Sequence, residues 1–147
     1  MPAKDKGLAL KTFIKLMRAS ASISARSHRP LADEGVSESQ FGVLEALYQL
    51  GPLCRRDLIE KILKTGGNIT LVVDNLEKHG LVERTRSSAD RRRVTIALTP
   101  KGREVIERVY PKIEESISRE MSILKSEEME TLSALLKKVG LGEHRAG

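Results

Sequence analysis

The sequence predicts a mainly α-helical protein with one small β-hairpin, and three observations lead to this fold class. Apolar residues recur every three or four positions over most of the 147 residues, which is typical of helices. They alternate with polar residues only between about residues 82 and 98, which predicts two strands. Glycine and proline separate the segments. A chain of this length can bury a substantial core, so we treat residues 1–147 as a single domain.

The first predicted helix covers about residues 7–26. Its apolar stripe consists of Leu10, Phe13, Ile14, Met17 and Ala21. Residues 28–36 contain Pro30 and Gly35 and are expected to form a connector. Ser37 is the predicted N-cap of the next helix, because Gln40 three residues later completes a capping box. The buried face of this second helix is expected to consist of Phe41, Val43, Leu44, Leu47 and Tyr48.

Two short helices are predicted next, at about residues 55–63 and 68–79, after Gly51 and Pro52 have stopped the preceding helix. The first should bury Leu58, Ile59, Ile62 and Leu63, and the second Ile69, Val72, Val73 and Leu76. The turn between them is Thr65-Gly66-Gly67, in which two glycines supply the positive φ angles that other residues resist. Gly80 is the predicted C-terminal cap of the second helix.

A hairpin follows the two short helices directly. Its second strand is predicted from Val94, Ile96 and Leu98, which alternate with polar or small residues. Two short helices followed at once by a β-hairpin constitute a winged helix-turn-helix. We place this core at about residues 37–99, the helix-turn-helix at about 55–79 and the wing at about 82–98.

Two more helices are predicted after the wing. Thr99 should cap the first of them, with Pro100 at the first helical position, and Pro111 is expected to bend it. Ser126 should cap the last helix, and Gly140 should end it.

The helices at about residues 7–26 and 100–140 lie outside a winged-helix unit that we expect to be self-sufficient. Each carries an apolar stripe, and isolated amphipathic helices are marginally stable in water. We therefore expect them to be dimerisation helices of a two-fold homodimer, which would match two DNA half-sites about 34–36 Å apart. The alternative is one larger monomeric bundle.

The positive charge is concentrated on the wing. The formal net charge is +6, and residues 82–103 hold seven Lys or Arg residues against Glu83 and Asp90. Five of these cations are Arg84, Arg86, Arg91, Arg92 and Arg93. A local basic element of this kind indicates contact with the phosphates of nucleic acid. The alternative for the wing is a solvated basic turn.

The second short helix is the predicted reader of double-stranded DNA. Its outward residues are short, polar or small, which lets a helix enter a major groove about 12 Å wide. With the turn before it, this predicted reading surface comprises Thr65, Gly66, Gly67, Asn68, Thr70, Leu71 and Asn75. Asp74 and Glu77 lie near this face, and we expect both to turn away from the DNA backbone, because they would repel phosphate.

Two further groups of arginines are predicted to contact DNA. Arg55 and Arg56 should meet phosphate, although a surface ion pair with Asp57 or Glu60 is an equal alternative. On the wing, Arg86, Arg91, Arg92 and Arg93 suit the narrow minor groove, where negative potential is concentrated. Asp90 stands two residues before Arg92 and can orient its guanidinium by a bidentate pair.

Other classes of function find little support in the sequence. No nucleophile elbow, phosphate loop or metal-ligand spacing is present, so neither a catalytic site nor a metal or other cofactor is expected. Cys54 is the one redox candidate, although a small buried residue is the better interpretation. No apolar run approaches membrane-spanning length, so we expect a cytoplasmic protein without a membrane partner. A winged-helix protein-interaction module without DNA binding remains the alternative, but it predicts a wing without excess charge.

The segment from Leu63 to Gly102 resembles the MarR family of bacterial transcriptional regulators. The resemblance is carried by DNLEKHGLVER, then by Asp90-Arg91-Arg92, then by Leu98-Thr99-Pro100-Lys101-Gly102, in this order and spacing. The number and order of the flanking helices extend it over almost the whole chain.

This resemblance implies a homodimer that binds pseudo-palindromic promoter DNA, usually as a repressor. It implies that Arg92 enters the minor groove with Asp90 as its orienting partner. Many family members release DNA when a small, often aromatic or phenolic, molecule binds between the dimerisation and DNA-binding parts, whereas others respond to cysteine oxidation. From this architecture we expect a ligand crevice lined by Met17, Ala21, His28, Phe41 and Tyr48, the alternative for each being ordinary core packing.

Overall fold

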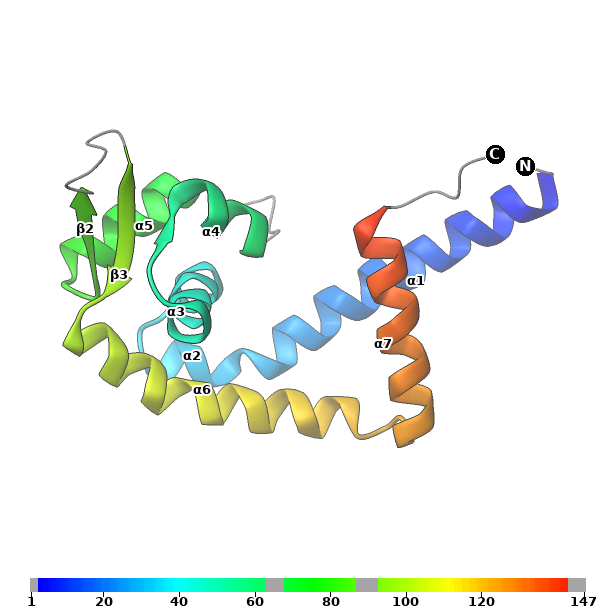
Figure 1. The fold of residues 1–147 in the computed structure, drawn as a ribbon. Helices are drawn as coiled ribbons and strands as arrows, with labels where there is room; N and C mark the ends of the chain where they lie inside the picture. The colour runs from blue at the N-terminus through cyan, green and yellow to red at the C-terminus, as the bar shows by residue number, and fades with distance from the viewer. Residues whose placement is uncertain (1–2, 63–67, 87–92, 143–147) are drawn as a thin grey trace.

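The computed structural model describes residues 3–62, 68–86 and 93–142. The elements in this part of the chain are α1 (Ala3–Ser27), α2 (Arg29–Asp33), α3 (Glu38–Leu50), β1 (Leu53–Cys54), α4 (Arg55–Ile62), α5 (Ile69–Lys78), β2 (Val82–Arg86), β3 (Val94–Leu98), α6 (Pro100–Met121) and α7 (Ser126–Leu141). Helices α3, α4 and α5 form a lobe with the sheet, and α1 and α6 lead away from it (Figure 1). The predicted mainly helical fold with a small wing is confirmed.

The predicted connector at residues 28–36 contains a short helix, α2, which the sequence analysis did not predict. Pro30 lies in the first turn of α2, where its missing N–H costs no hydrogen bond, and Leu31 is 2% exposed and anchors the turn in the core. Glu34 follows α2 and accepts hydrogen bonds from Arg108 at 2.9 Å and Lys112 at 2.6 Å on α6. The bonds from Lys112 and then Arg108 lower the pKa of the Glu34 carboxyl.

Helix α3 begins and ends as its sequence predicts. The Ser37 hydroxyl accepts a hydrogen bond from the Gln40 backbone N–H at 3.0 Å, and the Gln40 side chain accepts one from the Ser37 N–H at 2.9 Å. Gly51 ends the helix with a φ of 80°, a conformation that favours glycine. The predicted buried face is confirmed except for Tyr48, which is only partly buried and lies beside Tyr110.

The sheet has three strands in the order β1-β3-β2, and both pairings are antiparallel. The predicted hairpin is β2 and β3, paired from Val82 opposite Leu98 to Arg86 opposite Val94. The sequence analysis missed β1, which is two residues long and pairs with Ile96 and Thr95 of β3. Such a short strand has no alternation of its own to detect, because its partner strand alone makes it a strand.

The hydrophobic core extends beyond residues 37–99. Leu31 and Val36 enter it from one side, and Ile106, Val109 and Ile113 of α6 enter it from the other. The expectation that the winged-helix unit is self-sufficient was therefore wrong. Helix α6 is a core helix as far as Ile113, and its last turns lead away from the lobe (Figure 1).

The ends of the C-terminal helices required small corrections. Thr99 caps α6 as predicted, and α6 continues through Pro111. Helix α7 starts at Ser126 itself, and the backbone N–H of the preceding Lys125 donates to the Glu128 carboxylate at 2.9 Å, so Ser126 is not the cap. The helix runs past Gly140 to Leu141, and Gly142 ends it with a φ of 62°.

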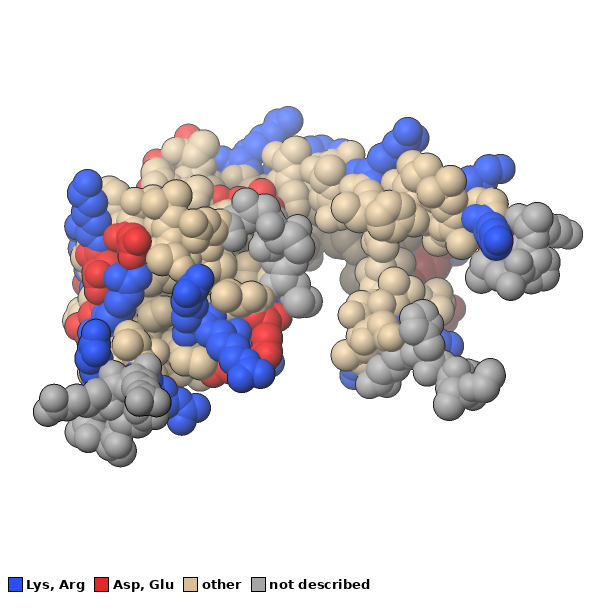
Figure 2. Space-filling model, turned by 90° about the horizontal axis from the view of Figure 1, so that it is seen from above, with Lys and Arg blue, Asp and Glu red and all other residues tan. Residues whose placement is uncertain are grey.

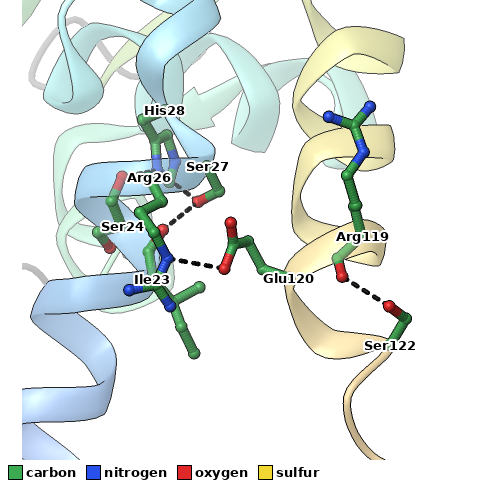
Figure 3. A network of polar contacts seen from close by, with 8 residues as sticks. All are labelled: Ile23, Ser24, Arg26, Ser27, His28, Arg119, Glu120 and Ser122. Atoms are coloured by element: carbon green, nitrogen blue, oxygen red, sulfur yellow. Dashed lines mark hydrogen bonds and ion pairs between the residues drawn. The ribbon is translucent and has the colours of Figure 1, made fainter.

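Polar contacts join α1 to the rest of the molecule near its C-terminal end. Arg26 donates to the Glu120 carboxylate on α6 at 2.7 Å (Figure 3). Within α1 itself, the fully buried Ser27 hydroxyl donates to the Ile23 carbonyl at 2.6 Å. The remainder of α1 extends from this junction as an arm (Figure 1).

Hydrogen bonds from the start of α6 to backbone carbonyls hold it against the segment that follows α5. The Thr99 N–H donates to the Leu81 carbonyl at 3.1 Å, and the Thr99 hydroxyl donates to the Gly80 carbonyl at 2.6 Å. Lys101 adds a hydrogen bond from Nζ to the His79 carbonyl at 3.1 Å. A Cβ at Gly102 would lie 1.9 Å from the Leu81 carbonyl oxygen, so only glycine fits there.

Within the described ranges, no helix combines the length and the apolar content that crossing a membrane would require.

We predict that Gly102→Ala lowers the free energy of unfolding by about 3 kcal/mol or more, because the new methyl group overlaps backbone that cannot move independently. Thermal and urea unfolding measure this effect. Gly140→Ala is the matched control, since a Cβ there meets nothing within 4 Å, and it should change stability by less than about 1 kcal/mol. Equal stability of the two variants would contradict the close contact.

Candidate nucleic-acid interface

Helix α5 presents one buried and one exposed face. Ile69, Val73 and Leu76 are buried in the lobe, whereas Leu71 is 57% exposed and Asn75 is also exposed. Leu71, Asp74 and Lys78 follow one another at intervals of three and four residues, so they share the exposed side. This is the side available to a nucleic-acid groove.

The predicted reading residues are not equivalent in the structure. Asn68 is the N-cap of α5, and its side-chain oxygen accepts a hydrogen bond from the Leu71 N–H at 3.3 Å. Thr70 directs its hydroxyl oxygen inward, where it is buried without a partner among the described residues, so this hydroxyl is not on the exposed face. Thr65, Gly66 and Gly67 lie outside the described residues.

Arg84 of β2 connects the wing to α5. Its guanidinium donates to the Glu77 carboxylate at 3.0 Å and also pairs with Asp74. Asp74, and to a lesser extent Glu77, raises the pKa of Arg84 above its ordinary value. The two carboxylates of α5 therefore pair with a cation of the same chain, which compensates charge that would otherwise repel DNA phosphate.

The sequence analysis counted Arg84 among the basic residues of the wing, left it out of the predicted DNA contacts and assigned it no partner. The signal that could have identified it is the pair of acidic residues three positions apart on α5, followed by a single arginine early in the adjoining strand. Periodicity does not show which strand lies beside which face of a helix, so the pairing emerges only in the folded structure.

Two further wing cations lie where the described strands end next to the hairpin tip. Arg86 ends β2, Arg93 precedes β3, and both are exposed. Asp90, Arg91 and Arg92 lie outside the described residues. Figure 2 shows Lys and Arg atoms gathered around the end of the molecule that carries the sheet.

Arg55 and Arg56 begin α4 and are both exposed. Arg56 lies 3.9 Å from Glu60, with side-chain exposures of 88% and 64%, so this ion pair is loose and leaves the guanidinium accessible. Asp57 instead accepts a hydrogen bond from the Cys54 thiol at 3.1 Å. Cys54 is only partly buried, so it is more accessible than expected.

The five residues predicted for a ligand crevice do not gather in one place. Met17 and Ala21 are exposed on α1, and the Tyr48 ring lies 5.6 Å below the Arg103 guanidinium. His28 contacts Phe41 edge to face, with ring centroids 6.0 Å apart.

Phe41 lines a cavity that the sequence did not reveal. The cavity has a volume of about 470 Å³ and lies between α3, the second half of α6 and the start of α7. Tyr110 and Ile113 of α6 contribute to its walls, and Glu45 enters from α3. Its size suits a small organic molecule. Metal binding has no comparable support, because the described residues contain no cluster of His, Cys, Asp or Glu that could hold an ion.

Comparison with known proteins identifies the class to which this interface belongs. Residues 36–94 match the family model described as MarR family. The chain is 37% identical over 133 residues to the HTH-type transcriptional regulator MhqR of Bacillus subtilis, covering 90% of this chain and 92% of MhqR. The chain belongs to the MarR family.

The fold agrees with solved structures of this kind. The regulator BpsR of Bordetella bronchiseptica, whose DNA binding is regulated by 6-hydroxynicotinic acid, superposes with a TM-score of 0.79 at 26% identity, over 88% of this chain and 98% of BpsR. NadR in complex with 4-hydroxyphenylacetate superposes with a TM-score of 0.73 at 27% identity, over 86% and 89% of the two chains. This MarR-family chain is therefore a winged-helix, DNA-binding transcriptional regulator, and the alternative of a module without DNA binding is not supported.

We predict that Arg84→Gln weakens binding to duplex DNA roughly ten-fold, which is about 1.4 kcal/mol. The change leaves Asp74 and Glu77 without a counter-charge beside the exposed face of α5, where they would repel phosphate. Fluorescence anisotropy with a labelled duplex measures the affinity.

A triple variant that combines Arg84→Gln with Asp74→Asn and Glu77→Gln should recover the wild-type affinity, because it no longer carries the two carboxylates. Arg119→Gln, which removes an exposed ion pair of α6, is the control and should bind normally. Failure of the triple variant to recover would show that Arg84 contacts DNA itself.

Proposed function

We propose that this MarR-family regulator is a homodimer that represses transcription from a pseudo-palindromic duplex site and releases it when a small aromatic ligand binds. A bacterial transcriptional regulator acts on the chromosome, so we place it in the cytoplasm.

The apolar surface of α1 and α7 is the observation that supports a dimer. Helix α7 is sixteen residues long and contains no buried residue. Its exposed apolar side chains are Leu135, Leu136, Val139 and Leu141, and those of α1 are Leu8, Leu10, Phe13, Ile14 and Met17. In Figure 2 the part of the molecule that lies away from the lobe, which α1 and α7 form, is mostly tan. Amphipathic helices without a partner surface are marginally stable in water, and a second copy related by a two-fold axis supplies that surface most economically.

The proposed DNA contacts follow the geometry of the lobe. Asn68, Leu71 and Asn75 would face base edges in the major groove, and Arg55 and Arg56 would meet the phosphate backbone. The wing arginines, Arg92 foremost with Asp90 as its orienting partner, would enter the minor groove on either side of the site. Thr70 would contribute only if its side chain rotated, since its hydroxyl now points into the lobe.

The proposed ligand would bind in the cavity beside Phe41. The cavity beside Phe41 lies where α6 leaves the lobe for the arms. A molecule seated there would contact both the helix that carries the core and the start of α7, so its binding could alter the separation of the two DNA-binding lobes. BpsR and NadR, whose ligands are small aromatic acids, support such regulation.

We predict that Arg92→Ala weakens binding to a selected operator duplex by about 1–3 kcal/mol, because a minor-groove contact is lost. Selection of bound sequences from random duplex supplies the operator, and anisotropy at fixed salt measures the affinity. Lys138→Ala on α7, far from the wing in the sequence and fold, should bind normally. An unchanged affinity for Arg92→Ala would remove this residue from the interface.

We predict that the double variant Leu135→Glu and Val139→Glu is a folded monomer, because both side chains are more than half exposed in the single chain and so contribute little within it. Sedimentation velocity at micromolar concentration measures the mass, and circular dichroism checks the fold. Ala134→Glu, also exposed but away from the apolar stripe, should remain dimeric. A wild-type protein that sediments as a monomer would overturn the dimer.

A further inference from the structure

The cavity between α3, α6 and α7 carries negative charge and no positive charge among the described residues that line it. Its walls are mainly apolar and aromatic, with Phe41, Tyr110 and Ile113 among them. The charged residues at its surface are Glu45 of α3 and Glu114 of α6, and neither Lys, Arg nor His joins them.

Glu45 carries a partly buried carboxylate that could accept a hydrogen bond from a ligand. It is partly buried, and within the described ranges its carboxylate forms no hydrogen bond and no ion pair. Burial raises the pKa of this carboxyl, since its charge is only partly compensated by water. A partly buried acceptor of this kind is stabilised by a partner that donates a hydrogen bond.

The charge of the cavity contrasts with the ligands of the similar regulators. The two molecules named for BpsR and NadR, 6-hydroxynicotinic acid and 4-hydroxyphenylacetate, are both carboxylic acids. A carboxylate seated in this cavity would meet Glu45 and Glu114 without a counter-ion in its lining. Glu45 is partly buried and Glu114 is exposed, and like charges brought together repel each other, so the cavity disfavours the ligand class of those proteins.

We propose that this cavity binds a small aromatic ligand that carries no carboxylate and donates a hydrogen bond to Glu45. The inference rests on the proposed ligand regulation and specifies its chemistry. Phe41 and Tyr110 offer faces and edges for an aromatic ring. The Glu45 carboxylate accepts a phenol, alcohol or ammonium hydrogen, and Ser118 at the cavity wall is a second polar group.

A neighbouring hollow of about 460 Å³ shares Phe41 and Glu45 but differs in charge, because His28 and Lys61 help to line it. An aromatic acid could find a cation there. The two sites are therefore distinguishable by the charge of the ligand and by the effect of replacing Lys61.

Three molecules with the same 4-hydroxyphenyl-methylene group test the proposal. Tyrosol ends in a hydroxyl, tyramine in an ammonium and 4-hydroxyphenylacetate in a carboxylate, so they differ mainly in terminal charge. Calorimetric titration of the full-length protein without DNA should show tyrosol and tyramine binding at least ~30-fold more tightly than 4-hydroxyphenylacetate. Equal or tighter binding of the carboxylate, or binding of none of the three at millimolar concentration, overturns the proposal.

Glu45→Gln keeps the size of the side chain and removes its charge, so it should reduce this discrimination to about three-fold or less. Glu115→Gln is the matched control, since this α6 carboxylate is 76% exposed and pairs with Arg119, and it should keep the wild-type order. An unchanged order in Glu45→Gln refutes the role of Glu45. Tight 4-hydroxyphenylacetate binding that Lys61→Ala abolishes would place the ligand in the neighbouring hollow instead.

Failure of this inference is separable from failure of the proposed function. The same protein is titrated with operator duplex, and each ligand is then added to the complex. Release of DNA by 4-hydroxyphenylacetate alone would keep ligand-regulated DNA binding and refute only the charge selection. Loss of duplex binding by the unliganded protein would refute the proposed function, whatever order the ligands follow.

Discussion

The contact between the Leu81 carbonyl and the first turn of α6 sets the geometry of the whole lobe. At this point the end of α5, the start of β2, the end of β3 and the start of α6 meet within a few residues. Thr99 donates hydrogen bonds to the carbonyls of Gly80 and Leu81, and Gly102 brings α6 against the Leu81 backbone. Helix α5, the β2–β3 wing and α6 therefore share this one contact point, and a change in the orientation of one element would disturb the other two.

Charge within the lobe is arranged around this contact point. The reading helix carries two carboxylates close to its exposed side, which alone would oppose binding to a polyanion. Arg84 lies on the strand that begins directly after this contact point, and from there it reaches both carboxylates. The same short connection that fixes the wing beside α5 thus also brings Arg84 to the two carboxylates of α5.

Helix α6 joins the DNA-binding part of this regulator to its arms. Ile106 and Val109 are fully buried in the lobe, Ile113 lies both in the core and at the cavity, and the last turns lead to α7. Under the proposed function, one rigid helix therefore contacts the core, the ligand and the dimer interface in succession. Because carboxylates line the cavity, we expect a ligand without a carboxylate, in contrast to the aromatic acid bound by NadR.

Much of this structure was determined by local sequence. The Ser37–Gln40 capping box, the Gly51 and Gly80 stops, the Thr99-Pro100 helix start and the alternation in β3 depend on residues a few positions apart, so they could be predicted. The concentration of arginine on the wing likewise needs no coordinates. The tertiary structure decided what depends on distant segments meeting: the β1 pairing, the share of α6 in the core, the Arg84 pairs, the inward Thr70 hydroxyl and the acidic cavity. Periodicity states which face of an element is buried, but only packing states what that face meets.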